Sequence, residues 1–242
     1  MHTPSAAEVV EVWERCQHWS PPERAVAIAR LAHRETVLPA VEDESVGDRD
    51  RALLALRRRM FGDRLPMVLT CPACKNDLEL VLSISALLDS EKQDDGHVRL
   101  AVEGLHVTAR QPTSRDLVDA AATGNREAAR WVLIERCVEA TDTHGTAVPV
   151  GELPASLLDS VGDALGAADP LADVVVRTAC AICGHESGAA LDVPLYLWAE
   201  FTVTAQRVIW DVHALATAYG WRESDILEMS AVRRQAYLDL IP

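Results

Sequence analysis

Four of the six cysteines form two Cys-x-x-Cys pairs, Cys71/Cys74 and Cys180/Cys183, with 106 positions between Cys74 and Cys180. A spacing of two residues lets both thiolates of a pair face one metal ion, and two pairs complete a closed tetrahedral shell of sulfur, the usual ligand set of structural zinc. We therefore predict one structural Zn²⁺ per chain, bound by these four cysteines. Iron can occupy the same four-thiolate site, so iron remains an alternative occupant.

Each pair is predicted to lie in a tight turn between two strands. Residues 67–70 and 78–82 flank the first pair, and residues 174–178 and 189–193 flank the second. In a thioredoxin-like redox site, a Cys-Pro-Ala-Cys motif would instead begin a helix, which lowers the pKa of one thiol. Because a strand pattern follows Cys74, a thiol redox protein is the weakest hypothesis.

The remaining reactive residue types favour a structural role. Four thiolates leave no open position on the metal, and a catalytic zinc needs one. His185 follows the second pair and is expected to face solvent, since the shell is already complete. Cys16 and Cys137 lie on apolar helix faces and are predicted to be buried thiols. The sequence carries no phosphate-binding glycine loop, nucleophile elbow or paired-histidine zinc helix, so we predict that the protein is not an enzyme.

The charge balance excludes two general classes of partner. The 242 residues include 37 Asp and Glu against 23 Lys and Arg, a net charge of −14. Binding nucleic acid or an anionic membrane surface needs a basic face, so neither is expected as a partner. No apolar stretch reaches the roughly 18 residues of a spanning helix, and no secretory signal is recognisable. We expect a cytoplasmic protein, in which thiols stay reduced.

Apolar spacing and capping signals predict the elements that position the cysteines. A capping box at Thr113 begins one helix, and a strand pair is predicted at 98–102 and 106–110. The acidic segment 41–50 and residues 89–97 are predicted to be loops, and the cluster of Arg57, Arg58 and Arg59 is expected to point mostly outward. The other predicted helices cover 6–19, 21–33, 49–61, 125–139, 154–166, 194–219, 222–228 and 231–240.

These elements predict an α+β fold that is predominantly helical. Helical N-terminal and C-terminal parts would surround a small β zinc ribbon built from the two distant Cys-x-x-Cys turns, called knuckles below. The expected organisation is an N-terminal helical region at 1–64, a split ribbon region at 65–193 and a C-terminal long helix with a helical hook at 194–242. A helical insert at 98–170 would separate the two halves of the ribbon.

The C-terminal run from Trp210 to Ile241 resembles the closing segment of baseplate proteins from contractile phage tails of the T-even type and from related bacterial contractile injection systems. The two knuckles and the stretch from Gln111 to Leu117 look like longer, zinc-ribbon members of that family. The resemblance covers roughly residues 65–242 and is densest after 194. The residues that match the closing pattern are Ala216, Tyr219, Trp221, Glu223, Asp225, Ile226, Leu227, Ser230, Arg233, Arg234, Tyr237, Leu238, Leu240 and Ile241.

The resemblance implies a structural or assembly component of a baseplate, whose partners are other baseplate or tail proteins. Trp221 and Tyr237 lie just outside the apolar stripe of the long helix, and with Arg233 and Arg234 they are candidate partner-binding residues. The alternative is a stand-alone cytoplasmic zinc-ribbon adaptor or regulator. Acidic residues around the knuckles, such as Asp77 and Glu186, argue against contact of that ribbon with nucleic acid.

Overall fold

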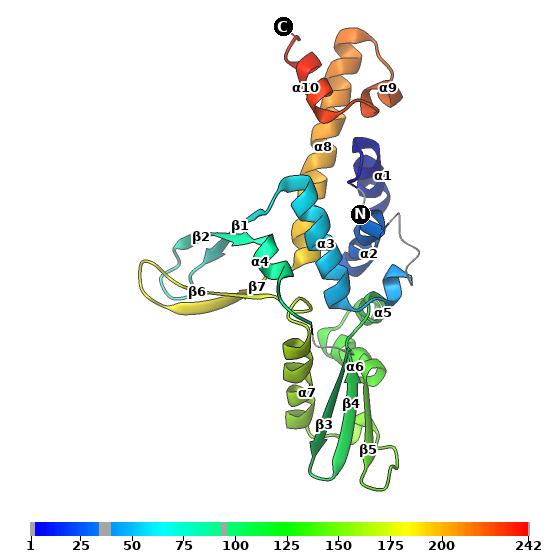
Figure 1. Cartoon of the computed structure of the whole chain (residues 1–242), viewed down its shortest axis with the longest axis vertical. Helices are drawn as coiled ribbons and strands as arrows, with labels where there is room; N and C mark the ends of the chain where they lie inside the picture. Colours follow the sequence, from blue (N-terminus) through cyan, green and yellow to red (C-terminus); the bar gives the residue numbers. More distant parts are fainter. Residues whose placement is uncertain (1–2, 34–39, 93–95, 242) are drawn as a thin grey trace.

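The computed structural model describes residues 3–33, 40–92 and 96–241 of the chain (Figure 1). Three N-terminal helices and the first part of a long C-terminal helix form the centre of the molecule, which we call the helical base. It consists of α1 (Ala6–Cys16), α2 (Pro21–His33), α3 (Val46–Phe61) and the first half of α8 (Val193–Tyr219).

The helix starts follow local capping chemistry. At α1, Ser5 and Glu8 form a reciprocal capping box. At α3, the Ser45 side chain accepts a hydrogen bond from the Asp48 backbone N–H, so the helix begins at Val46 and not near residue 49. The acidic segment predicted to be a loop therefore contains a 3-10 turn, η1 (Val41–Asp43), and the first turn of α3.

One apolar core joins the two ends of the chain. The predicted stripe of α8 is confirmed at Phe201, Ala205 and Val208, which are buried against α1, α2 and α3. Phe201 and Ile28 are fully buried, at 0% exposure each. The N-terminal and C-terminal helices thus share a core, and everything between them extends from it.

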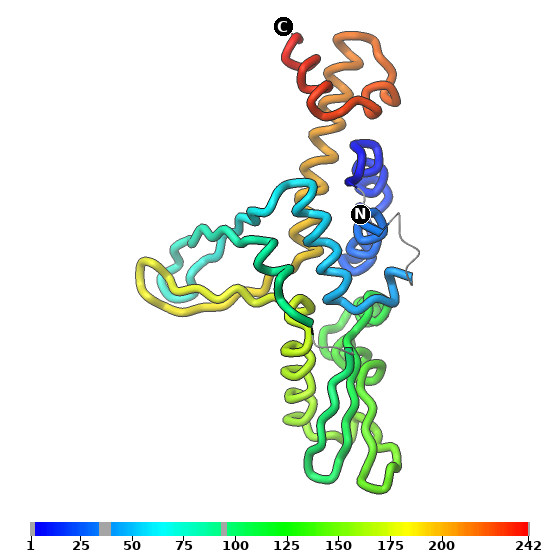
Figure 2. The backbone as a smooth tube through the Cα atoms, in the orientation of Figure 1, coloured from blue at the N-terminus to red at the C-terminus, as the bar shows by residue number. Residues whose placement is uncertain are grey.

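Two antiparallel hairpins project to one side of the helical base, one above the other (Figure 2). The first, β1 (Arg64–Thr70) with β2 (Asp77–Ser83), continues into α4 (Ile84–Leu88). The second pairs β6 (Val175–Ala179) with β7 (Glu186–Ala190). The strand predicted at 189–193 was wrong in position, because the turn after Cys183 is tight and pairing resumes at Glu186.

The insert between the hairpins has its own small core. The predicted strand pair is confirmed as β3 (His97–Val102) and β4 (Leu105–Arg110), and a third strand that the sequence analysis missed, β5 (Val138–Asp142), pairs with β4. Val107, Val138, Leu157 and Val161 are among its buried residues. The other elements are α5 (Ser114–Ala122), α6 (Arg126–Cys137), η2 (Val150–Glu152) and α7 (Ala155–Ala168).

Past the helical base, α8 continues to Tyr219 and is capped by Gly220, whose φ of +70° suits a glycine cap. The chain then folds back as a hook of two short helices, α9 (Glu223–Leu227) and α10 (Ala231–Leu238). The molecule is elongated, with the hook at one end and the insert at the other (Figure 1). Among the described helices, none has the length and apolar character needed to cross a membrane.

Candidate metal centre

The two cysteine pairs lie in turns with the same backbone pattern. In the first, the Cys71 N–H donates to the Asn76 carbonyl at 2.9 Å and the Lys75 N–H donates to the Cys71 carbonyl at 2.9 Å. In the second, the Cys180 N–H donates to the His185 carbonyl at 2.9 Å and the Gly184 N–H donates to the Cys180 carbonyl at 2.8 Å. The turns are therefore equivalent, residue for residue.

This turn needs a left-handed backbone at its fifth residue. Gly184 meets the requirement with φ of +72°, whereas the equivalent Lys75 has φ of +62°. Glycine adopts this conformation without steric cost, and lysine does not. The second turn thus has the favoured residue type at this position, and the first turn is strained there.

The turns bring the four predicted ligands together. The Sγ atoms of Cys71 and Cys183 are 3.7 Å apart, and those of Cys74 and Cys180 are 3.6 Å apart. All four sulfur atoms lie within 4.8 Å of one another. Four sulfurs bound to one zinc ion at about 2.3 Å lie about 3.8 Å from each other in a tetrahedron. The donor set and its spacing therefore fit a four-thiolate metal ion.

The cluster is part buried and part open. Cys71 and Cys180 are buried and contact Leu78, whereas Cys183 is exposed. A closed shell of four thiolates needs no free path to solvent, so partial burial suits a structural site.

Local hydrogen bonds favour the thiolate form at the first turn. The side chain of Asn76 donates to Cys74 Sγ at 3.3 Å, and this bond, with one from the Asn76 backbone, lowers the pKa of Cys74 to about 6. The backbone N–H of Cys74 is the largest cause of the lowered pKa of Cys71. Thiolates are the metal-binding form of cysteine, so these bonds prepare two ligands for a cation.

The fourth thiol shows the opposite behaviour when no metal is bound. At Cys183 the His185 backbone N–H lowers the pKa, but burial and the hydrogen bonds with the other three cysteines outweigh it and raise the pKa to about 12. Four sulfurs this close cannot all carry negative charge without a cation between them. A metal ion between the sulfur atoms would balance the charge of the four thiolates.

The roots of both hairpins are held by α3 and α8. Nη1 of Arg57 donates to the carbonyls of Gly62 and Arg64, each at 2.7 Å, where α3 leads into β1. The Tyr196 hydroxyl on α8 donates to the Pro66 carbonyl at 2.6 Å. The second hairpin leads directly into α8, so the same helix positions both turns (Figure 2).

Sequence reasoning placed several residues correctly and missed others. His185 is exposed, and Cys16 and Cys137 are buried, as predicted. The roles of Asn76 and Arg57 were missed. Arg57 was predicted to face mostly outward with its neighbours, but it is only 4% exposed, because its guanidinium pairs with Glu200. Arg57 lies four residues after Leu53, which puts both on one face of the helix, and this spacing was the available hint.

The four candidate partner-binding residues lie together in the hook. Tyr219, Trp221 and Tyr237 form one aromatic cluster, with the Tyr219 and Trp221 rings stacked at 4.5 Å. Arg233 is exposed and lies over the Tyr237 ring. Arg234 is buried; it donates to the Met229 carbonyl at 2.7 Å and pairs with Asp211 on α8 at 3.5 Å, so it fastens the hook to the long helix.

A comparison with protein-family models matches the T4 bacteriophage base plate protein family over residues 23–192. This range runs from α2 to the end of the second hairpin and includes all four clustered cysteines. It ends before the C-terminal run, although that run carries most of the resemblance seen in the sequence. Comparisons with curated proteins and with solved structures returned no match. Because the matched residues make up most of the chain, the protein belongs to the T4 bacteriophage base plate protein family.

Proposed function

We propose that the protein is a structural or assembly component of the baseplate of a phage-like contractile injection system, stabilised by a structural zinc ion. The observation that carries this proposal is the family match over residues 23–192. An elongated molecule with surfaces at both ends and one side suits a part that joins several neighbours. The proposed role is non-enzymatic, with assembly in the cytoplasm before incorporation into a particle.

The zinc ion would act as a clamp between two distant parts of the chain. The hairpins β1–β2 and β6–β7 form separate two-stranded sheets, and no backbone pairing between the described strands joins one hairpin to the other. Isolated two-stranded hairpins are marginal in water. A zinc ion bound to Cys71, Cys74, Cys180 and Cys183 would link them, and metal–thiolate binding contributes on the order of 10 kcal/mol to folding in small zinc peptides.

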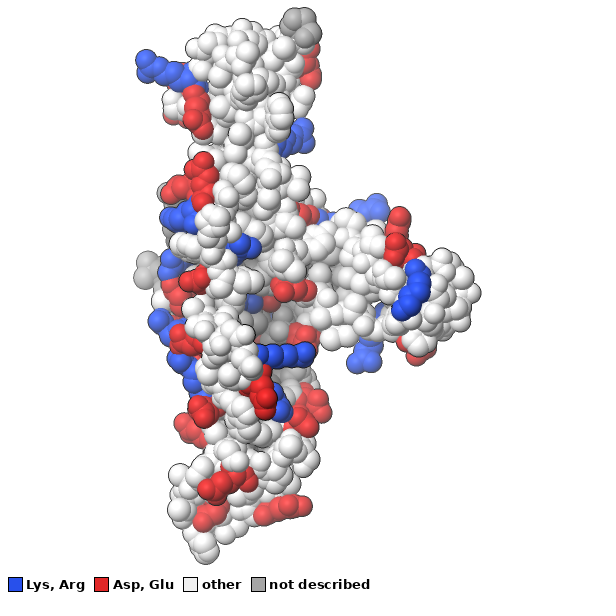
Figure 3. Space-filling model, turned by 180° about the vertical axis from the view of Figure 1, so that it is seen from behind, with Lys and Arg blue, Asp and Glu red and all other residues white. Residues whose placement is uncertain are grey.

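The hook is the proposed contact surface for other baseplate or tail proteins. Uncharged surface covers much of this end of the molecule when it is viewed from behind (Figure 3). Trp210 is 71% exposed on α8, and Val232 is 82% exposed on α10. Trp221, Tyr237 and Arg233 would present a preformed aromatic and basic patch, and Arg234 would support it from within.

The proposal is tested by isolating intact particles from the source cells and identifying their proteins by mass spectrometry. We expect the protein to be present, and its gene to lie beside genes for sheath, tube and spike proteins. Particles of normal composition that lack this protein at every stage of assembly would contradict the proposal. A stand-alone zinc-ribbon adaptor is the alternative, and free protein bound to a regulatory partner would favour it.

A further inference from the structure

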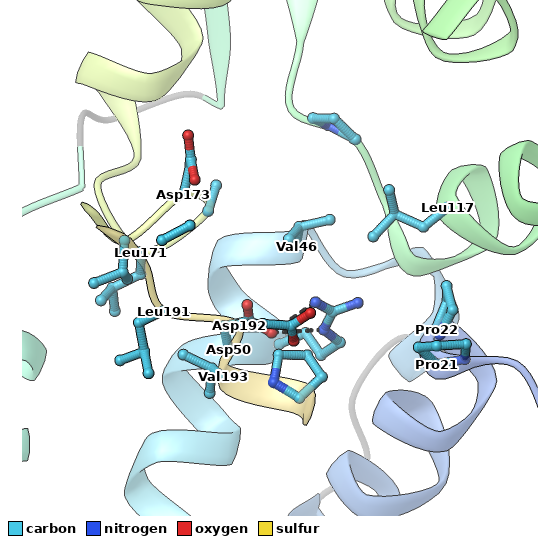
Figure 4. A pocket seen from close by; sticks show the side chains of 16 residues that line it. Pro21, Pro22, Val46, Asp50, Leu117, Leu171, Asp173, Leu191, Asp192 and Val193 are labelled. Atoms are coloured by element: carbon cyan, nitrogen blue, oxygen red, sulfur yellow. Dashed lines mark hydrogen bonds and ion pairs between the residues drawn. The ribbon is translucent and has the colours of Figure 1, made fainter. Parts of the chain in front are cut away.

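A pocket of about 370 Å³ lies at the root of the second hairpin, away from the metal centre (Figure 4). Its lining comes from the start of α2, the first turns of α3 and α5, and the chain on both sides of the β6–β7 hairpin. The pocket therefore lies where the hairpin, the insert and the helical base meet. Its volume is at the small end of ligand-binding pockets, which begin at about 300 Å³.

Most of the wall is apolar. The side chains of Pro21 and Leu117 lie on one side, and those of Leu171, Leu191 and Val193 lie on the other (Figure 4). Such walls accept an alkyl chain and exclude water from whatever charged group follows it. They do not supply the several oxygen ligands that a calcium or magnesium ion needs.

One oxygen of the Asp50 carboxylate, which lines the pocket, is left without a hydrogen bond from the described residues. Asp50 is 5% exposed, and Nε and Nη2 of Arg49 both approach its Oδ1 at 2.7 Å. Within the part of the chain that the structure describes, Oδ2 of Asp50 has no hydrogen-bond partner. Because Asp50 lines the pocket, this carboxylate oxygen can accept a hydrogen bond from a donor that enters it.

The lining carries more negative than positive charge. The described residues that line it include three carboxylates, Asp50, Asp173 and Asp192, and one guanidinium, that of Arg49. Burial raises the pKa of Asp50 to about 6; Arg49 opposes this shift, and the nearby charges of Asp192 and Asp169 add to it. Three carboxylates against one guanidinium leave the lining with more negative than positive charge, which attracts a second cation.

We propose that this pocket receives an arginine or lysine side chain of a neighbouring protein. The alkyl stem would pack against the apolar wall, and the cationic head would donate to Asp50 Oδ2 and to Asp192. Basic side chains that fill such pockets are typical anchors of protein interfaces. The neighbour as source rests on the proposed function, whereas the cation preference rests on the pocket alone.

The preference is tested by titrating the full chain, loaded with zinc, with Nα-acetyl-arginine methylamide and following backbone amide signals by NMR. The uncharged norleucine analogue is the matched probe. We expect saturable shifts at residues 46–50 and 190–193 with the arginine probe only. Equal shifts with norleucine, or no shift at these residues, would overturn the proposal.

Variants then test which groups attract the cation. Asp173 and Asp192 are exposed, and Asp173→Asn with Asp192→Asn removes both charges while an asparagine still caps α8. We expect affinity for the arginine probe to fall about three- to tenfold, as two exposed ion pairs allow. Asp163→Asn on α7 is the matched control and should leave affinity unchanged. An unchanged affinity in the double variant would refute the charge argument.

The source of the cation is tested separately. Putrescine is a small diamine, and tighter binding of putrescine than of the blocked arginine would refute a protein side chain as the occupant. In isolated particles, the double variant should be present at lower occupancy than the Asp163→Asn control. Probe binding without incorporation into any particle would refute the proposed function but not the pocket. Incorporation without probe binding would refute the pocket but not the function.

Discussion

Arg57 on α3 and Glu200 on α8 form a two-point ion pair across 143 positions of sequence, with Nε 3.0 Å from Oε2 and Nη2 2.7 Å from Oε1. The third nitrogen of the same guanidinium binds the backbone at the root of the first hairpin. One side chain thus fixes a helix pair and the start of the metal-bearing hairpin together.

Replacing Arg57 with alanine should lower the free energy of unfolding by about 3 kcal/mol, because it leaves a partly buried Glu200 and two carbonyls without their donor. Urea unfolding followed by circular dichroism measures the loss. Arg58→Ala is the matched control, since Arg58 is exposed and donates to the Ser85 hydroxyl at the surface, and its cost should stay below about 1 kcal/mol. Similar costs for both variants would contradict the assigned role of Arg57.

Metal analysis of the purified protein should give one zinc ion per chain. Cys180→Ser should release the metal and make the insert sensitive to protease, because residues 169–174 run directly from α7 into the clamped hairpin. Cys16→Ala removes a buried thiol far from the cluster and should retain the metal. Metal-free protein with four freely reactive thiols at Cys71, Cys74, Cys180 and Cys183 would refute the site.

Exchange at the fifth position of each turn should have opposite effects. Lys75→Gly relieves a left-handed lysine and should raise the stability of the zinc-bound protein by up to about 1 kcal/mol. Gly184→Ala introduces the same strain in the other turn, where φ is +72°, and should lower stability by about 1 kcal/mol. Thermal unfolding of both variants tests the pair. If both variants changed the stability in the same direction, backbone strain at this position would not determine the stability of these turns.

Asp116 should make the insert sensitive to acid. Burial alone would raise its pKa, but hydrogen bonds from Arg110 and Thr113 outweigh burial and hold the pKa far below the ordinary 3.8. The folded state therefore releases this proton more readily than the unfolded state. Its stabilising contribution is present above pH 3.8 and is lost as the pH falls below that value.

Asp116→Asn should lower stability at neutral pH by about 3 kcal/mol, because Arg110 and Arg136 lose a buried partner. The variant should also show a flatter decline of stability below pH 4. Asp119→Asn, which removes an exposed partner of Arg136, is the control and should have a small effect. Unfolding curves between pH 3 and pH 7 separate the outcomes, and an unchanged acid dependence in Asp116→Asn would refute the assignment.

Features that depend on neighbours in sequence were predictable. The capping box at Thr113, the stripe of α8 and the two turns each follow from residue types within a few positions. The family resemblance and the pairing of the four cysteines followed from motifs of the same local kind. The four sulfur atoms lie within 4.8 Å of one another, which suits a shared metal ion, but metal binding and the identity of the metal stay predictions.

Features that depend on distant contacts were not predictable. An arginine beside leucines is solvated unless a carboxylate far along the chain meets it, as Glu200 meets Arg57. Strand β5 follows α6 without a break, and only pairing with β4 makes residues 138–142 a strand. The pocket around Asp50 is likewise formed by five separate stretches of chain, and no stretch shows it alone.

The 27 residues of α8 amount to a rod of about 40 Å at 1.5 Å per residue. Its first half is embedded in the helical base and its last turns pack against α9 and α10, so the hook is held at a fixed offset from the hairpins and the insert (Figure 1). A helix has no hinge along its length unless something interrupts it, and the described residues of α8 past its first turn contain no proline or glycine. The protein is therefore a rigid spacer, and the length of α8 sets the distance between partners bound at the hook and partners bound near the hairpins and the insert.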